Sequence, residues 1–216
     1  LDRIYEVKPQ YKATDRVLPK IVHTYHMPRA LLNALLEGFA WDADGKIYHS
    51  IEDVYDYSAR VAGAVGIMMS VLMGVRDAKT LARAADLGTA MQLTNIARDV
   101  GEDARLGRIY LPLDELRSEG VDTTQMLANP EYTDGVGRVV KRLLERADWL
   151  YQRSDHGIAQ LPRKYQPGIR AARKLYAAIG DKVIENNYNS IDQRAIVGTR
   201  KKLGLLSSAV VFAQPH

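Results

Sequence analysis

The 216-residue sequence contains no cysteine and only two phenylalanines and two tryptophans. The absence of cysteine excludes a small domain held together by disulfide bonds and any metal site built from thiolates. A membrane span needs about 18 uncharged apolar residues, and the longest uncharged run, at 61–75, is shorter than that. No apolar core of a secretory signal follows Asp2 and Arg3. Because the first residue is leucine, we expect a processed, trimmed or partial chain. With neither a membrane span nor a signal in this sequence, we expect the protein to be cytoplasmic.

Charge is nearly balanced, with 30 lysines and arginines against 26 aspartates and glutamates. A mixed surface of this kind predicts no nucleic-acid partner, and an apolar content of 46% excludes a disordered chain. The densest basic cluster, Arg200, Lys201 and Lys202, precedes an apolar tail at 203–213. Two interpretations stay open: the solvated start of a final helix, or peripheral contact with an anionic membrane.

The sequence pattern predicts an all-α fold. Stretches rich in Ala, Leu, Arg, Glu and Met lie between Pro and Gly residues, and no alternating run of Val, Ile and Thr indicates a strand. Because the residue before a proline avoids the helical region, we expect Pro28 to begin a new helix inside the first helical segment. We predict one domain over 1–216, an antiparallel bundle with helical segments near 18–38, 51–73, 78–104, 113–119, 134–160, 167–187 and 201–213.

Small residues cluster within the predicted helix at 51–73. Ala62, Gly63 and Ala64 are consecutive, and Gly66 follows shortly after them. A glycine inside a helix costs about 0.8–1.0 kcal/mol relative to alanine, so we expect another group to approach this backbone closely. The pattern is consistent with a tightly packed neighbouring helix and also with a hollow kept open for a ligand.

The strongest chemical signal lies in the predicted helix at 78–104 and its extension. At 100° per residue, an arc of about 140° holds six polar side chains: Gln92, Asn95, Arg98, Asp99, Glu102 and Asp103. Earlier residues on this face are apolar or small, and so is the opposite face. Such a helix is expected to be buried, with its polar stripe facing an internal cavity.

Asp99 and Asp103 lie one helical turn apart, where like charges repel each other. A cation between them would relieve this repulsion, and oxygen ligands without nearby His or Cys suit Mg²⁺ or Mn²⁺. Arg98, with Arg105 and Arg108 beyond the arc, is suited to hold phosphate oxygens. Metal, arginine and apolar face together predict an amphiphilic diphosphate as the substrate, which is the chemistry of a prenyl diphosphate.

Two long motifs resemble those of a known family. Residues 87–112 resemble the second aspartate-rich signature of the squalene/phytoene synthase family, with the sequence LGTAMQLTNIARDVGEDARLGRIYLP. Residues 57–66 resemble the family's other signature, with the sequence YSARVAGAVG. The two motifs occur in the family's order and at its spacing. The sequence of the first motif is most similar to the phytoene synthase branch of the family.

The resemblance implies a fold and a role for each matching residue. The fold would be an isoprenoid-synthase-like helical bundle around a central cavity. Asn95, Asp99 and Asp103 would bind Mg²⁺ or Mn²⁺ bridged to the substrate diphosphate, with Asp99, Asp103 and Arg98 as the catalytic set. Substrate contacts are implied for Gln92, Arg98, Tyr176 and Arg194 at the diphosphate, and for Val61, Ala62, Val65, Leu87 and Met91 along the prenyl chain.

The implied reaction is a head-to-head condensation of two geranylgeranyl diphosphates, through prephytoene diphosphate, to phytoene and diphosphate in carotenoid biosynthesis. Two alternatives stay open: a squalene or dehydrosqualene synthase relative that uses farnesyl diphosphate, and a non-catalytic family member that acts in binding or assembly. A terpene cyclase would need a different second motif, which the sequence lacks. The catalytic base is open between the released diphosphate and a tyrosine.

The family's first aspartate-rich motif, DxxxD, has no counterpart before Asp99. Asp42 and Asp44 lie in a segment typical of a turn, and Asp53 and Asp56 have a different spacing. We therefore expect the chain to lack the amino-terminal helices of the family and to hold half of the metal site.

Overall fold

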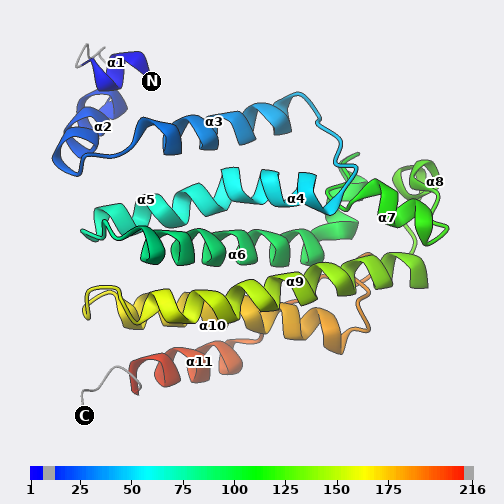
Figure 1. The fold of residues 1–216 in the computed structure, drawn as a ribbon. Helices are drawn as coiled ribbons and strands as arrows, with labels where there is room; N and C mark the ends of the chain where they lie inside the picture. The colour runs from blue at the N-terminus through cyan, green and yellow to red at the C-terminus, as the bar shows by residue number, and fades with distance from the viewer. Residues whose placement is uncertain (7–12, 212–216) are drawn as a thin grey trace.

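The computed structural model describes residues 1–6 and 13–211, and within these ranges every regular element is helical. Figure 1 shows long helices stacked side by side in one bundle. The elements are α1 (Asp2–Tyr5), α2 (Ala13–Thr24), α3 (Arg29–Ala43), α4 (Ile51–Ser58), the π-helix η1 (Ala59–Gly63), α5 (Ala64–Leu72), α6 (Ala78–Arg105), α7 (Leu113–Ser118), α8 (Thr123–Ala128), α9 (Asp134–Ile158), α10 (Gln166–Glu185) and α11 (Thr199–Val211). The predicted all-α bundle is confirmed for the described residues.

Local sequence signals explain where several helices begin. At α4, the Ser50 hydroxyl accepts a hydrogen bond from the backbone N–H of Asp53, whose carboxylate accepts one from the Ser50 N–H. At α6, the Asp77 carboxylate accepts a hydrogen bond of 2.8 Å from the backbone N–H of Thr80. Pro28 has extended backbone and directly precedes α3, so the prediction that it separates two helices is confirmed.

Short elements and helix ends differ from the sequence prediction. The short helices α1 and α8 were not predicted. The helix α2 begins before the predicted start at residue 18, and Pro19 lies inside it. The last predicted helix corresponds to α11, while its predicted residues 212 and 213 lie outside the described residues.

The segment predicted as one helix at 51–73 is divided by a π-helical turn. This turn, η1, separates α4 from α5. A π turn widens the helix locally and changes which side chains share a face. The turn contains Val61 and Ala62, which border the cavity described below, and Gly63, where a Cβ would lie 3.0 Å from the Thr89 hydroxyl of α6. The prediction of a continuous α-helix was therefore wrong at this point.

Two glycines allow α6 to approach η1 and α5 backbone to backbone. A Cβ at Gly66 would lie 2.2 Å from the carbonyl oxygen of Ala84, and a Cβ at Gly88 would lie 2.2 Å from that of Ala62. Any side chain at either position would force the helices apart. Tight packing thus explains these glycines. Ala62 and Gly66 also border a cavity, and its use for a ligand stays a prediction.

The helix α6 lies at the centre of the bundle, packed against α4, η1, α5, α9 and α10. The hydroxyl of its buried Thr94 forms a hydrogen bond of 2.9 Å with the Tyr151 hydroxyl of α9. The side chains of α6 that are almost fully buried include Leu93, Ile96, Ala97 and Val100. The predicted burial of the apolar face is therefore confirmed, and the polar stripe lies on a different side of the helix.

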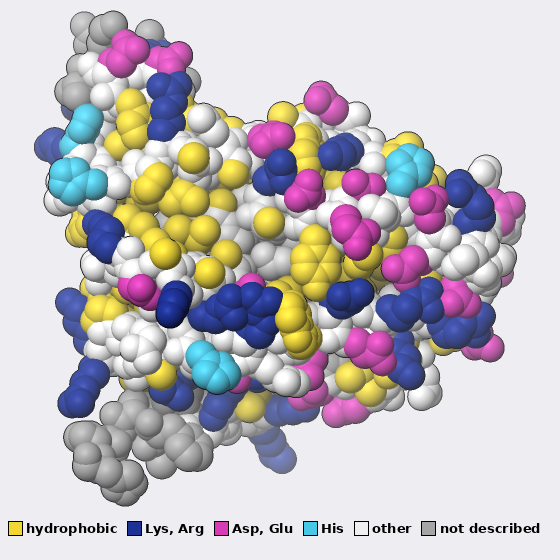
Figure 2. Space-filling model, in the orientation of Figure 1, with side chains coloured by type: hydrophobic (Ala, Val, Ile, Leu, Met, Phe, Trp, Pro, Cys, Tyr) yellow, Lys and Arg dark blue, Asp and Glu magenta, His cyan; other side chains and the backbone are white. Residues whose placement is uncertain are grey.

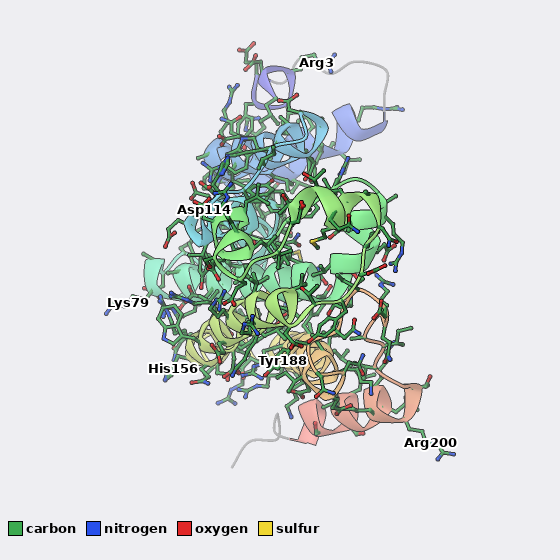
Figure 3. All side chains as sticks on the ribbon, turned by 90° about the vertical axis from the view of Figure 1, so that its right-hand side faces the viewer. Arg3, Lys79, Asp114, His156, Tyr188 and Arg200 are labelled. Carbon is green, nitrogen blue, oxygen red and sulfur yellow. The ribbon has the colours of Figure 1, made fainter. Side chains whose placement is uncertain are left out.

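None of the helices in the described ranges combines the length and apolar character needed to cross a membrane. Figure 3 views the bundle from the side of α7 and α8, with α11 at its lower edge. Arg200, at the start of α11, points away from the body of the molecule. Leu203 and Leu206 of the same helix are also exposed, so α11 presents basic and apolar side chains at the surface.

Candidate active site

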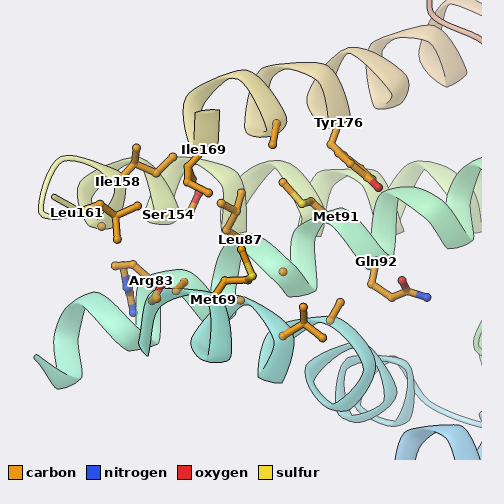
Figure 4. A pocket seen from close by; sticks show the side chains of 18 of the residues that line it. Met69, Arg83, Leu87, Met91, Gln92, Ser154, Ile158, Leu161, Ile169 and Tyr176 are labelled. Atoms are coloured by element: carbon orange, nitrogen blue, oxygen red, sulfur yellow. The ribbon is translucent and has the colours of Figure 1, made fainter. Parts of the chain in front are cut away.

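A cavity of about 350 Å³ runs alongside α6, bordered by η1 and α5, by α9 and by α10 (Figure 4). Its walls are mostly apolar and include Val61, Ala62, Val65, Met69, Leu87, Met91, Ile158, Leu161 and Ile169. Val65 and Met69 are 37% and 47% exposed, so the cavity opens to solvent on the side of α5. On the face drawn in Figure 2, apolar side chains also gather at the surface between α3 and α5, a separate area from this cavity.

The cavity joins the apolar part of the predicted site to part of its polar end, whereas Arg98, Asp99, Asp103 and Arg194 lie beyond its lining. All of the residues predicted to contact a prenyl chain border the cavity: Val61, Ala62, Val65, Leu87 and Met91. Gln92 and Tyr176, predicted to contact a diphosphate, lie together toward one end of it (Figure 4). The roles of these residues in binding stay predictions.

Asn95 borders the cavity about one turn beyond Gln92 on α6. Its side-chain oxygen is buried and has no hydrogen-bond partner among the described residues. A buried amide oxygen without a partner has lost its hydration without compensation. We therefore interpret this oxygen as a contact point for a cation or a ligand.

Asp99 lies a further turn along α6 and is held by two arginines. Arg98 donates from Nε to Oδ1 at 2.8 Å and from Nη2 to Oδ2 at 2.5 Å. Arg194, from the segment after α10, donates from Nε to Oδ1 at 2.9 Å and lies 3.1 Å from Oε2 of Glu102. Burial opposes ionisation of Asp99, but the arginine hydrogen bonds outweigh it and hold its pKa below the usual value.

Asp103, one more turn along, has an environment that opposes its charge. Burial raises the pKa of Asp103 to about 6, and the negative charges of Asp99 and Glu102 act in the same direction. The positive charge of Arg108 opposes this rise, whereas the negative charge of Asp42 adds to it. The stripe thus combines one firmly ionised carboxylate with one that takes up a proton near pH 6.

Asp42 is a part of this region that the sequence analysis missed. The segment was predicted to be a turn, but Asp42 lies within α3, and the turn follows at Gly45, which has a φ of +65°. The Asp42 carboxylate accepts hydrogen bonds of 2.9 Å from the hydroxyls of Tyr57 and Tyr110. Each of the two family signatures supplies one of these tyrosines, a signal that could have suggested a shared partner.

The tyrosine hydroxyls bound to Asp42 are held in their neutral form. Burial raises the pKa of Tyr57 well above its usual value, and the hydrogen bond to Asp42 raises it further. Burial likewise raises the pKa of Tyr110. The rings of Tyr57 and Tyr110 stack with centroids 5.3 Å apart, and Tyr48 packs against both. This cluster joins the ends of α3 and α4 to the segment after α6.

Two other predicted phosphate-binding arginines have partners outside the stripe. Arg105 donates a hydrogen bond of 2.9 Å to the carbonyl oxygen of Ile191. Arg108 donates one of 3.3 Å to the Tyr110 hydroxyl. The arginines that contact Asp99 directly are Arg98 and Arg194.

The donor set of the stripe fits a hard divalent cation. Among the described residues, no group of three or more His, Cys, Asp or Glu side chains forms a cage for a metal. Instead, two carboxylates and an unpartnered amide oxygen are typical ligands of Mg²⁺, because Mg²⁺ keeps several waters and also binds phosphate oxygens. Asn95, Asp99 and Asp103 are therefore suited to hold Mg²⁺ or Mn²⁺ together with an anionic ligand.

Several known proteins are similar to this chain in sequence. A family model described as squalene/phytoene synthase matches residues 1–202. The chain belongs to the squalene/phytoene synthase family. It is 52% identical over 213 residues to a phytoene synthase of Rhodobacter capsulatus, and the matched region covers 99% of this chain and 63% of that protein. It is 54% identical over 203 residues to a phytoene synthase of Cereibacter sphaeroides, with 94% and 57% covered. The chain thus spans about 60% of the length of these curated relatives.

Solved structures of the family share the fold. A dehydrosqualene synthase in complex with a ligand superposes with a TM-score of 0.86 at 30% identity, over 97% of this chain and 74% of that one. Squalene synthase HpnC from Alicyclobacillus acidocaldarius gives a TM-score of 0.80 at 25% identity, over 87% and 70%. The predicted isoprenoid-synthase-like architecture is therefore confirmed.

Proposed function

We propose that this chain provides the core of a Mg²⁺-dependent prenyltransferase that condenses two geranylgeranyl diphosphates head to head into phytoene and diphosphate, through prephytoene diphosphate. The observation that carries this proposal is an apolar cavity that ends beside Asn95, with Asp99 and its two arginines one helical turn further along α6. The identity of 52–54% to two phytoene synthases supports geranylgeranyl over farnesyl diphosphate.

The apolar walls bind and shield the prenyl chain. Each methylene group removed from water contributes about 0.8 kcal/mol, so a chain lying against Leu87 and Met91 is held strongly without any specific polar contact. The same walls exclude water from a reactive allylic cation, which water would otherwise quench. Gln92 and Tyr176 then mark the polar end, where the diphosphate lies.

Arg98 and Arg194 hold the leaving diphosphate. Both guanidinium groups are bonded to Asp99 in the structure, and both have additional N–H donors arranged in a planar fork. These arginines can turn from Asp99 to diphosphate oxygens and stabilise the negative charge that develops there. Bound Mg²⁺ would supply further neutralisation of that charge.

Two groups with raised pKa values, Asp103 and Tyr57, determine how protons are held at the site. Asp103 must be ionised to hold a cation, and its pKa of about 6 makes this the case above pH 6. Tyr57 is kept neutral by burial and by donation to Asp42, which disfavours a phenolate base at this position. We therefore favour the released diphosphate as the group that accepts the final proton.

Peripheral contact with a membrane is part of the proposal, because the substrate and the product are both lipid-soluble. The start of α11 combines Arg200, Lys201 and Lys202 with exposed Leu203 and Leu206, a combination suited to an anionic surface. Co-sedimentation with vesicles that contain phosphatidylglycerol, compared with neutral vesicles, tests this contact. Equal binding to both, or to neither, would contradict it.

The reaction is tested by incubating a complete version, which includes the family's amino-terminal helices, with labelled geranylgeranyl diphosphate and Mg²⁺, which should give a C40 hydrocarbon. A C30 product from farnesyl diphosphate without any C40 product would move the assignment to a dehydrosqualene- or squalene-forming enzyme. Asp99→Ala should abolish turnover while the helical circular dichroism signal stays unchanged. Retained turnover in this variant would remove Asp99 from the proposed metal site.

A further inference from the structure

The end of the cavity opposite Gln92 is separated from a second hollow by very few residues. A wide, open groove lies beyond it, bordered by residues 74–79, by His156 and by Gln160. Thr80, Arg83 and Gly157 border both the cavity and this groove. Figure 4 shows Arg83 at this end, near Leu161 and Ile158 and far from Gln92.

Arg83 is the large side chain of this partition. Gly157 has no side chain, and the Thr80 hydroxyl is tied to the Asp77 carboxylate by a hydrogen bond of 2.9 Å. A Cβ at Gly157 would lie 2.2 Å from the Arg83 Cβ, so the base of the arginine packs directly on α9. The wall between cavity and groove therefore consists mainly of the Arg83 stem.

An ion cluster fixes the position of this stem. The Nε of Arg83 lies 3.1 Å from Oδ2 of Asp86, and the Nε of Arg153 lies 3.2 Å from the same oxygen. The Asp86 side chain is only 14% exposed. Arg153 itself packs over the Trp149 ring at 4.3 Å. A long charged side chain can present its apolar stem to a cavity while its charged end is held elsewhere, and this cluster holds the Arg83 end.

The distance along α6 matches a prenyl chain of defined length. From Gln92 to Thr80 the helix rises about 18 Å. With carbon–carbon bonds of about 1.5 Å, an extended geranylgeranyl chain reaches about 19 Å and a farnesyl chain about 14 Å. A geranylgeranyl chain that starts near Gln92 thus ends near the level of Thr80, and a farnesyl chain ends about one turn short of it. The Arg83 stem tilts toward this level, because helical side chains lean toward the helix N-terminus.

We propose that Arg83, positioned by Asp86, closes the far end of the prenyl cavity and sets the longest chain that it accepts. This inference rests on the proposed function, since it assumes that a prenyl diphosphate occupies the cavity. Removing the stem would join the cavity to the groove and admit a longer chain. Asp86 is a positioning residue here, because it acts through Arg83.

The test compares dissociation constants of farnesyl, geranylgeranyl and geranylfarnesyl thiodiphosphates, measured by calorimetry with Mg²⁺. Arg83→Ala should improve binding of the C25 ligand relative to the C20 ligand at least tenfold, the range that a few methylene groups produce in an apolar pocket. Arg83→Met keeps a stem of similar length without the charge and should retain the wild-type ratio. Arg153→Ala is the matched control, because it removes the other arginine of Asp86 but not a wall of the cavity.

The outcomes separate this inference from the proposed function. If the wild-type protein binds none of the three ligands, the proposed function fails and this inference with it. If the wild-type protein prefers the C20 ligand and Arg83→Ala keeps the same C25 to C20 ratio, only the role of Arg83 is overturned. An equal gain in Arg153→Ala would also overturn it, since the effect would then come from the ion cluster rather than from the stem.

Discussion

Asp99 and Asp103 lie one turn apart on α6, yet replacing each by asparagine should change stability in opposite directions at neutral pH. The pKa of Asp103 is raised from 3.8 to about 6, because burial and two neighbouring negative charges oppose its ionisation. Asp103→Asn removes the charge and keeps the shape of the side chain. We therefore expect a more stable protein at pH 7.

The size of this gain follows from the pKa shift. A raised carboxyl pKa has no effect on stability below the unfolded value, and it lowers stability as the pH rises toward the folded value. A shift of about two units corresponds to about 3 kcal/mol, which solvent screening at a partly exposed group reduces to about 1–2 kcal/mol. In a chain of this size the melting temperature should rise by roughly 3–6 °C.

Asp99→Asn is the comparison variant with the opposite sign. The pKa of Asp99 is lowered by its arginine partners against the effect of burial, so its ionised form stabilises the folded state above the unfolded pKa. This contribution is lost as the pH falls through the folded pKa. Asp99→Asn should therefore lower the melting temperature at pH 7.

Thermal unfolding followed by circular dichroism from pH 3.5 to pH 8, without divalent cations, measures both effects. The Asp103→Asn gain should be absent at pH 3.5 and complete above pH 6. An unchanged melting temperature at pH 7 would refute the reasoning. So would a gain at pH 3.5 as large as the gain at pH 7, because it could not arise from the charge of Asp103.

Gly88→Ala places a Cβ 2.2 Å from the carbonyl oxygen of Ala62 and should lower the free energy of unfolding by more than about 2 kcal/mol. Gly168→Ala, with open space around the new Cβ, should be neutral or stabilising in the same urea titration, and equal losses would contradict the close approach of the helices. Arg194→Gln should raise Mn²⁺ affinity without diphosphate about two- to fivefold, since an exposed ion pair with Asp99 contributes up to about 1 kcal/mol. Electron paramagnetic resonance of free Mn²⁺ measures this change, and it should also show weaker enhancement of Mn²⁺ binding by inorganic diphosphate. Unchanged Mn²⁺ affinity would show that Arg194 does not compete with the cation.

The long helices and the polar stripe of α6 could be predicted from the sequence. Their apolar residues recur with a helical period over many turns, and the polar residues of the stripe repeat one turn apart. The prediction that α6 is buried rested on apolar residues on both of its faces, such as Ile96 and Leu87. Local spacing was sufficient for these features because it determines which side chains share a face.

The π turn and the Asp42 network could not be predicted, for different reasons. The turn at Ala59–Gly63 follows from the fit of Gly63 and Gly66 against α6, a contact between distant segments that no local period encodes. Asp42 is far in sequence from Tyr57 and Tyr110, and the folded chain alone brings them together. The same holds for Arg194: the family resemblance implied a diphosphate contact for it, and its ion pair with Asp99 was not predicted.

Binding of a divalent cation beside the polar end of the apolar cavity is tested most directly by anomalous diffraction from crystals grown with Mn²⁺ and geranylgeranyl thiodiphosphate. We predict a Mn²⁺ peak in contact with Asp99 and Asp103, and ligand density that runs along Leu87 toward Arg83. A cation bound elsewhere, or a prenyl chain that lies outside this cavity while Asp99 stays paired with Arg98, would contradict the account.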